Sequence, residues 1–174
     1  MITKQDLLDW LSEVDQKLNH EMVIVAAGGT AMTLLNLKES TRDVDFCVPE
    51  SDFEEFKCLS HTDLFKVDIF HSGYIVALQL PPDYITLAQD YPYPFKHLHL
   101  KTLKPEDIIV TKTSRLNARD IEDIKSLAKA DKVDLTFLKK RFEEVKDTYA
   151  GRKDDYAYHF NLVLEWFFSG EIKK

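Results

Sequence analysis

The run MVIVAA, from Met22 to Ala27, is the feature that most constrains the fold of this chain. This nearly continuous apolar run is far too short to cross a membrane and is typical of a buried strand. Gly28 and Gly29 end the run, and Thr30 to Leu37 has the apolar spacing of a short helix. The sequence therefore predicts a buried strand, a glycine turn and a helix in direct succession.

Two further strands are predicted to carry aspartates. Asp43 to Val48 alternates polar and apolar residues, so Asp43 and Asp45 should share one face and the aliphatic residues the other. The segment FKVDIF, from Phe65 to Phe70, repeats the pattern with Asp68 opposite its aliphatic face. Each strand thus buries one face and projects aspartate from the other.

Helical periodicity dominates both ends of the chain. Thr3 is expected to cap a first amphipathic helix, and Pro105 is expected to open another at its first turn. Further helices are predicted over Ser51–Leu59, Arg119–Ala130, Leu135–Tyr149 and Tyr156–Phe168. Tyr74 to Leu80 is compatible with strand or helix, and His97 to Lys101 predicts an edge strand.

These elements predict an α+β fold with a C-terminal helical segment. We expect residues 1–130 to form the core and residues 131–174 to pack on it as helices. The chain of 174 residues is long enough to bury a core without disulfides.

Composition narrows the classes of function. The net charge of -7 argues against a wholly basic nucleic-acid binder. Cys47 and Cys58 form no zinc-binding pattern and fit a reducing cytoplasmic compartment. No apolar stretch is long enough to span a bilayer, and the first residues lack the pattern of a signal peptide, so no membrane association is expected.

The aspartates suggest a metal site. Residues i and i+2 of a strand lie roughly 7 Å apart on one face, where two carboxylates repel unless a cation lies between them. Mg²⁺ takes one or two protein carboxylates together with phosphate oxygens. Asp43 and Asp45, with Asp68 on a neighbouring strand, are therefore predicted to hold divalent cations. The simpler alternative for this pattern is a solvated strand end.

The glycine turn suggests a phosphate site. Gly28 and Gly29 would let backbone N–H groups approach an anion, and Thr30 could donate its hydroxyl to the same group. The turn is not a Walker loop, because no lysine follows the glycines. A purely structural turn is the alternative.

The order of these motifs resembles the nucleotidyltransferase superfamily. The resemblance implies the polymerase-beta-like fold, a mixed sheet flanked by helices. Gly-Gly-Thr precedes Asp-Val-Asp by a gap at the long end for that pattern, and Asp68 follows in VDIF. The segment LKPEDIIVTKTSRLNARDIEDIKSL, from Leu103 to Leu127, is similar to the minimal, AbiEii-like branch. The resemblance covers about residues 22 to 130 and nothing in the C-terminal helices.

The resemblance implies transfer of a nucleoside monophosphate from a nucleoside triphosphate such as ATP, with Mg²⁺ or Mn²⁺ as cofactor. It implies that Asp43, Asp45 and Asp68 bind the metal, and that these three and Lys112 are catalytic. The residues expected to bind the nucleotide are Gly28, Gly29, Thr30, Arg42, Lys112, Arg119, Asp120 and Asp123.

Lys112 is singled out by spacing as well. It shares a helical face with Ile108 and Ile109, so it needs a carboxylate or a phosphate nearby if that face is buried. The alternative is a lysine whose ammonium reaches solvent. For Asp120 and Asp123 the alternative is a plain solvated helix face.

Three functions stay open on the sequence. The first is an active nucleotidyltransferase, in a toxin–antitoxin system or elsewhere, whose acceptor is a tRNA 3′ end, a protein or a small molecule. The second is a non-catalytic module on the same fold that acts as an antitoxin-like partner of a small protein. The third is an unrelated α/β protein with a structural Asp-Val-Asp. A local basic groove for RNA would use Lys66, Lys112, Arg115 and Arg119.

Overall fold

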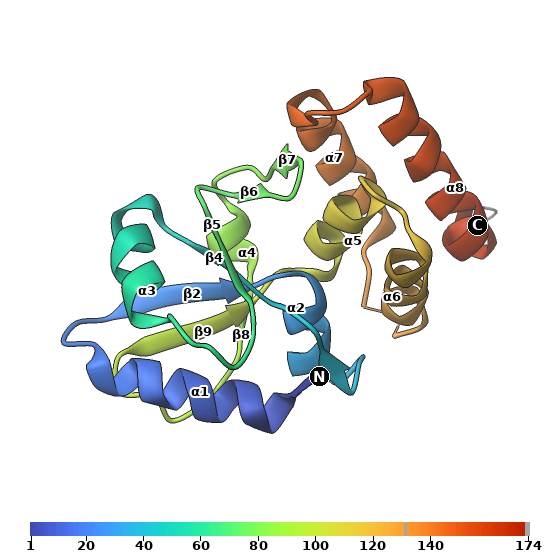
Figure 1. Ribbon diagram of the computed structural model, residues 1–174. Helices are drawn as coiled ribbons and strands as arrows, with labels where there is room; N and C mark the ends of the chain where they lie inside the picture. The colour runs from blue at the N-terminus through green and yellow to red at the C-terminus, as the bar shows by residue number, and fades with distance from the viewer. Residues whose placement is uncertain (131, 173–174) are drawn as a thin grey trace. The chain divides into compact units, whose positions relative to one another are not determined.

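The computed structural model describes residues 1–130 and 132–172, apart from the side chains of residues 171 and 172. The chain divides into two compact units (Figure 1). Unit 1 comprises Met1–Gly73 and Pro82–Leu103, and unit 2 comprises Tyr74–Pro81 and the chain from Lys104 onward. This division differs from the predicted boundary after residue 130, because the two helices before that boundary group with the C-terminal helices.

Unit 1 is built on a five-stranded mixed sheet, as the sequence predicted. Its strand order is β5-β4-β2-β9-β8. The strands are β2 (Met22–Ala26), β4 (Val44–Val48), β5 (Val67–His71), β8 (Gln89–Asp90) and β9 (Leu98–Thr102). β2 pairs antiparallel with β4 and parallel with β9, whereas β4 pairs parallel with β5. The α+β class is therefore confirmed.

The prediction that His97 to Lys101 forms an edge strand is wrong. β9 lies between β2 and the two-residue strand β8, which pairs with it antiparallel. Gln89 and Asp90 supply this extra edge, so the alternation within β9 reflects one covered face and not a free edge.

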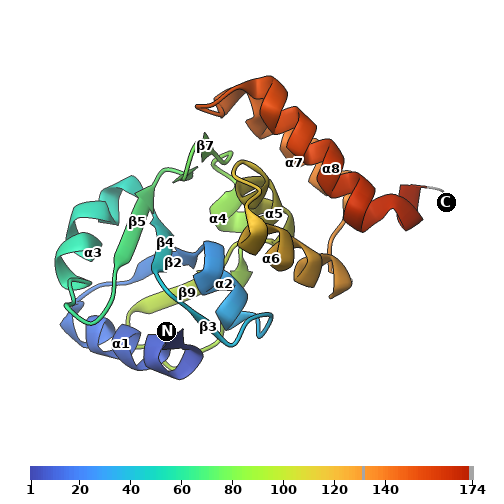
Figure 2. The ribbon, with the colours of Figure 1, turned by 45° about the vertical axis from the view of Figure 1, so that its right-hand side comes forward.

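The helices of unit 1 flank this sheet. They are α1 (Lys4–Lys17), α2 (Gly28–Leu34), α3 (Phe53–Leu59), α4 (Tyr84–Leu87) and the 3-10 turn η1 (Glu50–Asp52). Two short strands, β1 (Ile2–Thr3) and β3 (Ser40–Thr41), pair with each other. Figures 1 and 2 show α1 running along the sheet beside β9.

One face of the sheet forms the core of unit 1. The ring of Phe46 on β4 lies 6.3 Å from that of Trp10 on α1 and 5.9 Å from that of Phe56 on α3. Because side chains alternate along a strand, α1 and α3 cover the aliphatic face and leave the aspartate face opposite.

The two ends of α1 are held by polar contacts. Thr3 caps the first turn in a reciprocal capping box with Asp6, as its position predicted. Near the other end, the buried carboxylate of Asp15 accepts the backbone N–H groups of residues 96, 97 and 98 at 2.7, 2.8 and 2.8 Å. This contact fixes α1 to the start of β9.

Unit 2 is helical apart from one hairpin. Its helices are α5 (Pro105–Thr113), α6 (Ala118–Lys129), α7 (Leu135–Val145), the 3-10 turn η2 (Lys146–Thr148) and α8 (Lys153–Ile172). The ambiguous segment forms a hairpin of β6 (Tyr74–Ile75) and β7 (Leu78–Gln79). It joins unit 2 through Thr148, whose hydroxyl accepts the Gln79 N–H at 3.0 Å.

Helix α5 forms the centre of unit 2 and is buried along its whole length. Arg141 of α7 reaches it with a buried ion pair, in which Nε lies 2.5 Å from the Asp107 carboxylate. Tyr156 of α8 donates its hydroxyl to the carbonyl of Val110 at 2.9 Å, and burial raises the pKa of this tyrosine. Both contacts give a hydrogen-bonding partner to a polar group of α5, which is buried among the other helices of unit 2.

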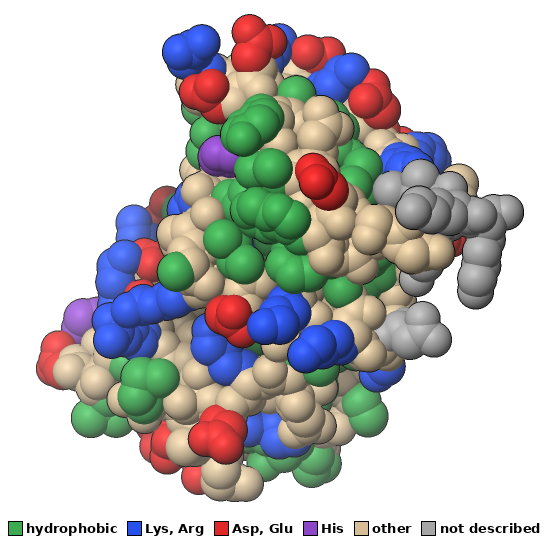
Figure 3. Space-filling view, turned by 90° about the vertical axis from the view of Figure 1, so that its right-hand side faces the viewer, with side chains coloured by type: hydrophobic (Ala, Val, Ile, Leu, Met, Phe, Trp, Pro, Cys, Tyr) green, Lys and Arg blue, Asp and Glu red, His purple; other side chains and the backbone are tan. Residues whose placement is uncertain are grey.

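The outer face of the C-terminal helices is partly apolar. Tyr158 and Trp166 of α8 are exposed, and Figure 3 shows hydrophobic side chains gathered on this face.

Within residues 1–130 and 132–172, no helix combines the length and the apolar character that crossing a membrane requires.

Candidate active site

The aspartate face of the sheet places two predicted site residues side by side. Asp45 of β4 and Asp68 of β5 are register partners in the parallel pair, so their side chains leave the same face. Asp43 precedes β4 by one residue and has the same parity as Asp45. Asp43 is exposed, whereas Asp45 and Asp68 are partly buried. The alternation in the two strands thus places Asp45 and Asp68 on one face of the sheet, as predicted.

Gly28 packs directly against this face. It opens α2 with a φ of 50°, and a Cβ built on it would lie 2.6 Å from Oδ2 of Asp45. The peptide N–H of Ala27 also donates to the carbonyl of Asp45 at 3.0 Å. Only glycine combines this backbone conformation with so close an approach. The backbone at the start of α2 therefore lies directly against Asp45.

Gly29 and Thr30 join α2 to the chain ahead of β4. A Cβ on Gly29 would lie 2.5 Å from Oγ1 of Thr41, whose hydroxyl donates to the carbonyl of Asp43 at 2.9 Å. Thr30 is fully buried, and its Oγ1 accepts the N–H of Asp45 at 2.8 Å. The predicted donation from Thr30 to a phosphate is not what the structure shows, since this hydroxyl is engaged with backbone and shielded from solvent.

Lys66 lies beside Asp68 and within electrostatic range of Asp43 and Asp45. Its Nζ is 2.7 Å from Oδ2 of Asp68. This hydrogen bond and the charge of Asp68, with weaker attraction to Asp43 and Asp45, raise the pKa of the Lys66 ammonium. The Lys66 ammonium is thus attracted electrostatically to all three aspartates.

The donor set suits a hard divalent cation in its chemistry. Three carboxylates on one face are the ligands that Mg²⁺ and Mn²⁺ take, and the Lys66 ammonium marks the place where positive charge is stabilised. Among residues 1–130 and 132–172, however, no three Asp, Glu, His or Cys side chains converge closely enough to hold a metal ion. The aspartates fit a divalent cation in charge and donor type, and their side chains would have to draw together around it.

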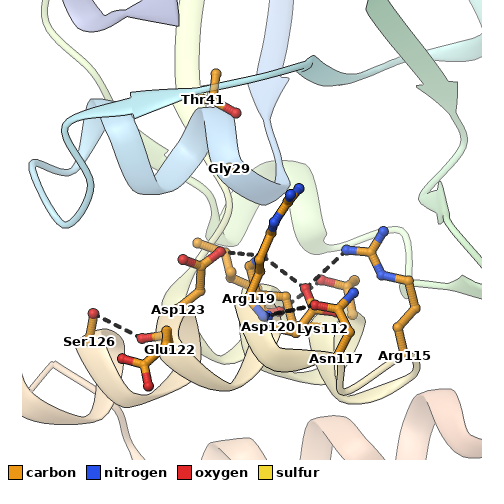
Figure 4. A network of polar contacts seen from close by, with 12 residues as sticks. Gly29, Thr41, Lys112, Arg115, Asn117, Arg119, Asp120, Glu122, Asp123 and Ser126 are labelled. Atoms are coloured by element: carbon orange, nitrogen blue, oxygen red, sulfur yellow. Dashed lines mark hydrogen bonds and ion pairs between the residues drawn. The ribbon is translucent and has the colours of Figure 1, made fainter. Parts of the chain in front are cut away.

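A second polar cluster lies within unit 2 (Figure 4). Lys112 of α5 is buried, with Nζ 3.3 Å from Asp120 and 2.7 Å from Asp123 of α6. Nη2 of Arg115 lies 3.0 Å from the same oxygen of Asp120. Asn117 caps α6 by accepting the N–H groups of Arg119 and Asp120. We call Lys112, Arg115, Asp120 and Asp123 the α5–α6 cluster.

This cluster shows which of the two expectations for Lys112 holds, a buried charged partner or a solvent-exposed ammonium. The lysine does not reach solvent, and Asp120 and Asp123 are buried, so the alternatives of a solvent-reaching lysine and a solvated helix face are wrong. The ammonium needed a partner, and it has two carboxylates on the neighbouring helix. With both acids occupying it, the predicted contact between Lys112 and a triphosphate has no support in the described residues.

The remaining predicted nucleotide-binding residues are exposed. Arg42 lies in the connection before β4 and Arg119 on the first turn of α6. Figure 4 shows the Arg119 guanidinium pointing away from the α5–α6 cluster. Neither arginine side chain is buried in the core of its unit.

A comparison with protein families matches residues 4–173 to one family, which is described as nucleotidyltransferase of unknown function (DUF6036). The chain belongs to this family. The match extends over both units and supports the resemblance to the nucleotidyltransferase superfamily. The AbiEii-like branch stays a prediction. A search of curated proteins found no match.

Two residues of this DUF6036 nucleotidyltransferase contact the aspartates and were not predicted in those roles. Lys66 was considered for an RNA groove, although its position two residues before Asp68 on one strand face places it beside that carboxylate. Thr41 contacts Gly29 and Asp43 across a turn, and no local sequence signal identifies such a contact.

Proposed function

We propose that this DUF6036 member transfers a nucleoside monophosphate from a nucleoside triphosphate to a hydroxyl acceptor, at the aspartate face of unit 1. The observation that carries the proposal is the adjacent placement of Asp45 and Asp68 in register, with Gly28 packed on Asp45. A structural strand end would have no need for a helix start fitted this closely to a carboxylate.

In this proposal Asp43, Asp45 and Asp68 hold Mg²⁺ or Mn²⁺ together with the triphosphate. The cation supplies charge stabilisation for the phosphoryl group in transfer. Asp68 accepts the proton of the acceptor hydroxyl or orients it. The acceptor oxygen forms a bond to the α-phosphorus, the bond from that phosphorus to the bridging oxygen of the β-phosphate breaks, and pyrophosphate leaves.

Other residues of unit 1 position this chemistry. Thr30 holds the backbone of Asp45 through its buried hydroxyl, so we assign it to the orientation of that aspartate. Gly28 lies against the Asp45 carboxylate and Gly29 against the Thr41 hydroxyl, so both support the strand that carries the aspartates. A phosphate contact from the N–H groups of these glycines stays a prediction, and the exposed guanidinium of Arg42 supplies a positive charge for phosphate oxygens. A nucleotide contact of Arg119 stays a prediction.

A non-catalytic binding module is the second candidate. One observation favours it, namely that Lys66 already supplies a positive charge to the aspartates. In that case the sheet face would bind neither metal nor nucleotide, and the protein would act through a partner, as an antitoxin-like subunit does. Metal and nucleotide binding therefore separate the two functions.

A thermal-shift experiment tests the proposal. Addition of Mg²⁺ and ATP should raise the melting temperature of the protein, and Asp43→Asn with Asp45→Asn should abolish the rise. Asp63→Asn, at a fully exposed aspartate of unit 1, is the matched control and should keep the rise. No rise with any of the four nucleoside triphosphates and Mg²⁺ or Mn²⁺ would favour the binding module.

We also propose the cytoplasm as the compartment, since Cys47 and the exposed Cys58 are both free thiols. A tRNA 3′ end, a protein hydroxyl and a small molecule are all compatible acceptors, and the net charge of -7 weighs slightly against RNA. A role in a toxin–antitoxin pair would require a small protein partner, which a pull-down from the native host would identify.

A further inference from the structure

We propose that Lys66 is a tethered cation that competes with the divalent metal ion for the aspartate face and thereby sets its metal affinity. The inference rests on the proposed function, because it concerns the same three carboxylates. It assigns to Lys66 a role that the family description does not contain.

The sheet fixes where the Lys66 side chain leaves the backbone. Its carbonyl accepts the N–H of Val44 at 3.0 Å, which continues the β4–β5 ladder by one residue ahead of β5. Lys66 and Asp68 are two residues apart along this ladder and therefore share a face. Nζ reaches Oδ2 of Asp68 at 2.7 Å. The ammonium is directed to the carboxylates by strand geometry.

The charges leave room for a second cation. Three aspartates and one lysine carry a net charge of about -2 at neutral pH, from the ordinary ionisation of these side chains. The ammonium therefore offsets one of the three aspartate charges in this set. A divalent cation carries twice the charge of the lysine and binds several carboxylate oxygens at once.

The ion pair is also open to displacement. The side chains of Lys66 and Asp68 are 67% and 34% exposed, and pairs of this kind are weak because water screens them. Lysine has a flexible stem, so the ammonium can move to solvent without any change in the backbone. A metal ion that takes Asp68 must break this pair and tolerate a nearby positive charge, and both effects lower its affinity.

The test is Mn²⁺ binding by the full chain, measured as loss of the free-ion electron paramagnetic resonance signal. Lys66→Met removes the ammonium and keeps an unbranched side chain, whereas Lys66→Arg keeps the charge. Lys57→Met is the matched control, since it removes the same charge from α3, the helix that covers the opposite face through Phe56. Circular dichroism checks that each variant is folded.

We expect Lys66→Met to bind Mn²⁺ roughly three- to tenfold more tightly than the wild type, the scale of a weak ion pair together with a nearby like charge. Lys66→Arg and Lys57→Met should stay within about twofold of the wild type, since they keep the local charge or lie away from it. Binding by Lys66→Met alone, below detection in the wild type, would also support the inference.

Two other outcomes overturn it in different ways. If Lys66→Met binds as the wild type does, or more weakly, while Asp45→Asn loses binding, the competition is refuted and the proposed metal site survives. If neither the wild type nor Lys66→Met binds Mn²⁺ with dependence on Asp45, the inference and the proposed function fail together.

Discussion

The α-carbon of Gly28 and the carboxylate of Asp45 are in such close contact that no side chain fits between them. The relationship links the start of α2 to strand β4, and it favours glycine for two independent reasons. One is the left-handed backbone conformation, and the other is the space taken by Oδ2.

Gly28→Ala should therefore be strongly destabilising. We expect a loss of about 2–4 kcal/mol in the free energy of unfolding, because a methyl group meets a carboxylate at a positive φ. Gly170→Ala on α8 is the control, where a Cβ meets nothing within 4 Å and the change should be neutral or stabilising by up to about 1 kcal/mol. Equal stability of both variants by urea denaturation would refute the close contact.

Thr30→Val tests whether Thr30 positions Asp45. The valine keeps the shape of the side chain but leaves the N–H of Asp45 without its acceptor, which should cost about 1–3 kcal/mol. Thr33→Val loses a bond to the carbonyl of Gly29 within α2 and should cost less than about 1 kcal/mol. A larger loss in Thr33→Val than in Thr30→Val contradicts the assignment.

Lys112→Met tests the α5–α6 cluster. Removing the ammonium leaves Asp120 and Asp123 buried with Arg115 as the remaining cation of the cluster, which should cost about 3–5 kcal/mol of stability. Lys125→Met on α6 removes an exposed lysine paired with Glu122 at 3.7 Å, and should change stability by less than about 0.5 kcal/mol. If Lys112→Met is as stable as Lys125→Met, the lysine is free for a ligand.

The Asp15 carboxylate predicts a dependence of stability on pH. Burial alone would raise its pKa, but the N–H groups of Lys96, His97 and Leu98 outweigh burial and hold the pKa below its usual value. A lowered folded pKa stabilises the protein above the unfolded pKa of about 3.9, and this stabilisation is lost as the pH falls through the folded pKa.

Asp15→Asn should consequently lower the free energy of unfolding by about 1–3 kcal/mol at pH 7. The difference from the wild type should shrink progressively as the pH falls below about 4. Asp9→Asn, at an exposed position of the same helix, should show no such difference. A constant difference between Asp15→Asn and the wild type from pH 7 to pH 3 would contradict the role of the charge.

Local chemistry allowed the sequence to predict the elements that carry the site. The alternation in β4 and β5 is a property of a few adjacent residues, so the common face of Asp45 and Asp68 followed from it. Short-range interactions also explain why Thr3 caps a helix and why Pro105 begins one, as predicted. These features need no knowledge of distant contacts.

Contacts between distant segments explain what the sequence did not predict. The short strand β8 covers β9, and the expectation of an edge strand failed for that reason. Periodicity showed that Lys112 needs an acidic partner, but the choice of Asp120 and Asp123 over a phosphate depends on how α6 packs against α5. The helix α2 begins at Gly28, before the predicted Thr30, and the approach of that glycine to Asp45 is likewise a contact between distant segments.

Transfer of label from the α-phosphate tests the central claim most directly. The protein is incubated with Mg²⁺, a cell extract and each nucleoside triphosphate, labelled at the α- or the γ-phosphate, beside Asp45→Asn and Asp63→Asn. The account predicts that one acceptor gains label from the α-phosphate and not from the γ-phosphate, in the wild type and Asp63→Asn but not in Asp45→Asn. Transfer that survives in Asp45→Asn, or no α-phosphate transfer from any nucleotide, would contradict it.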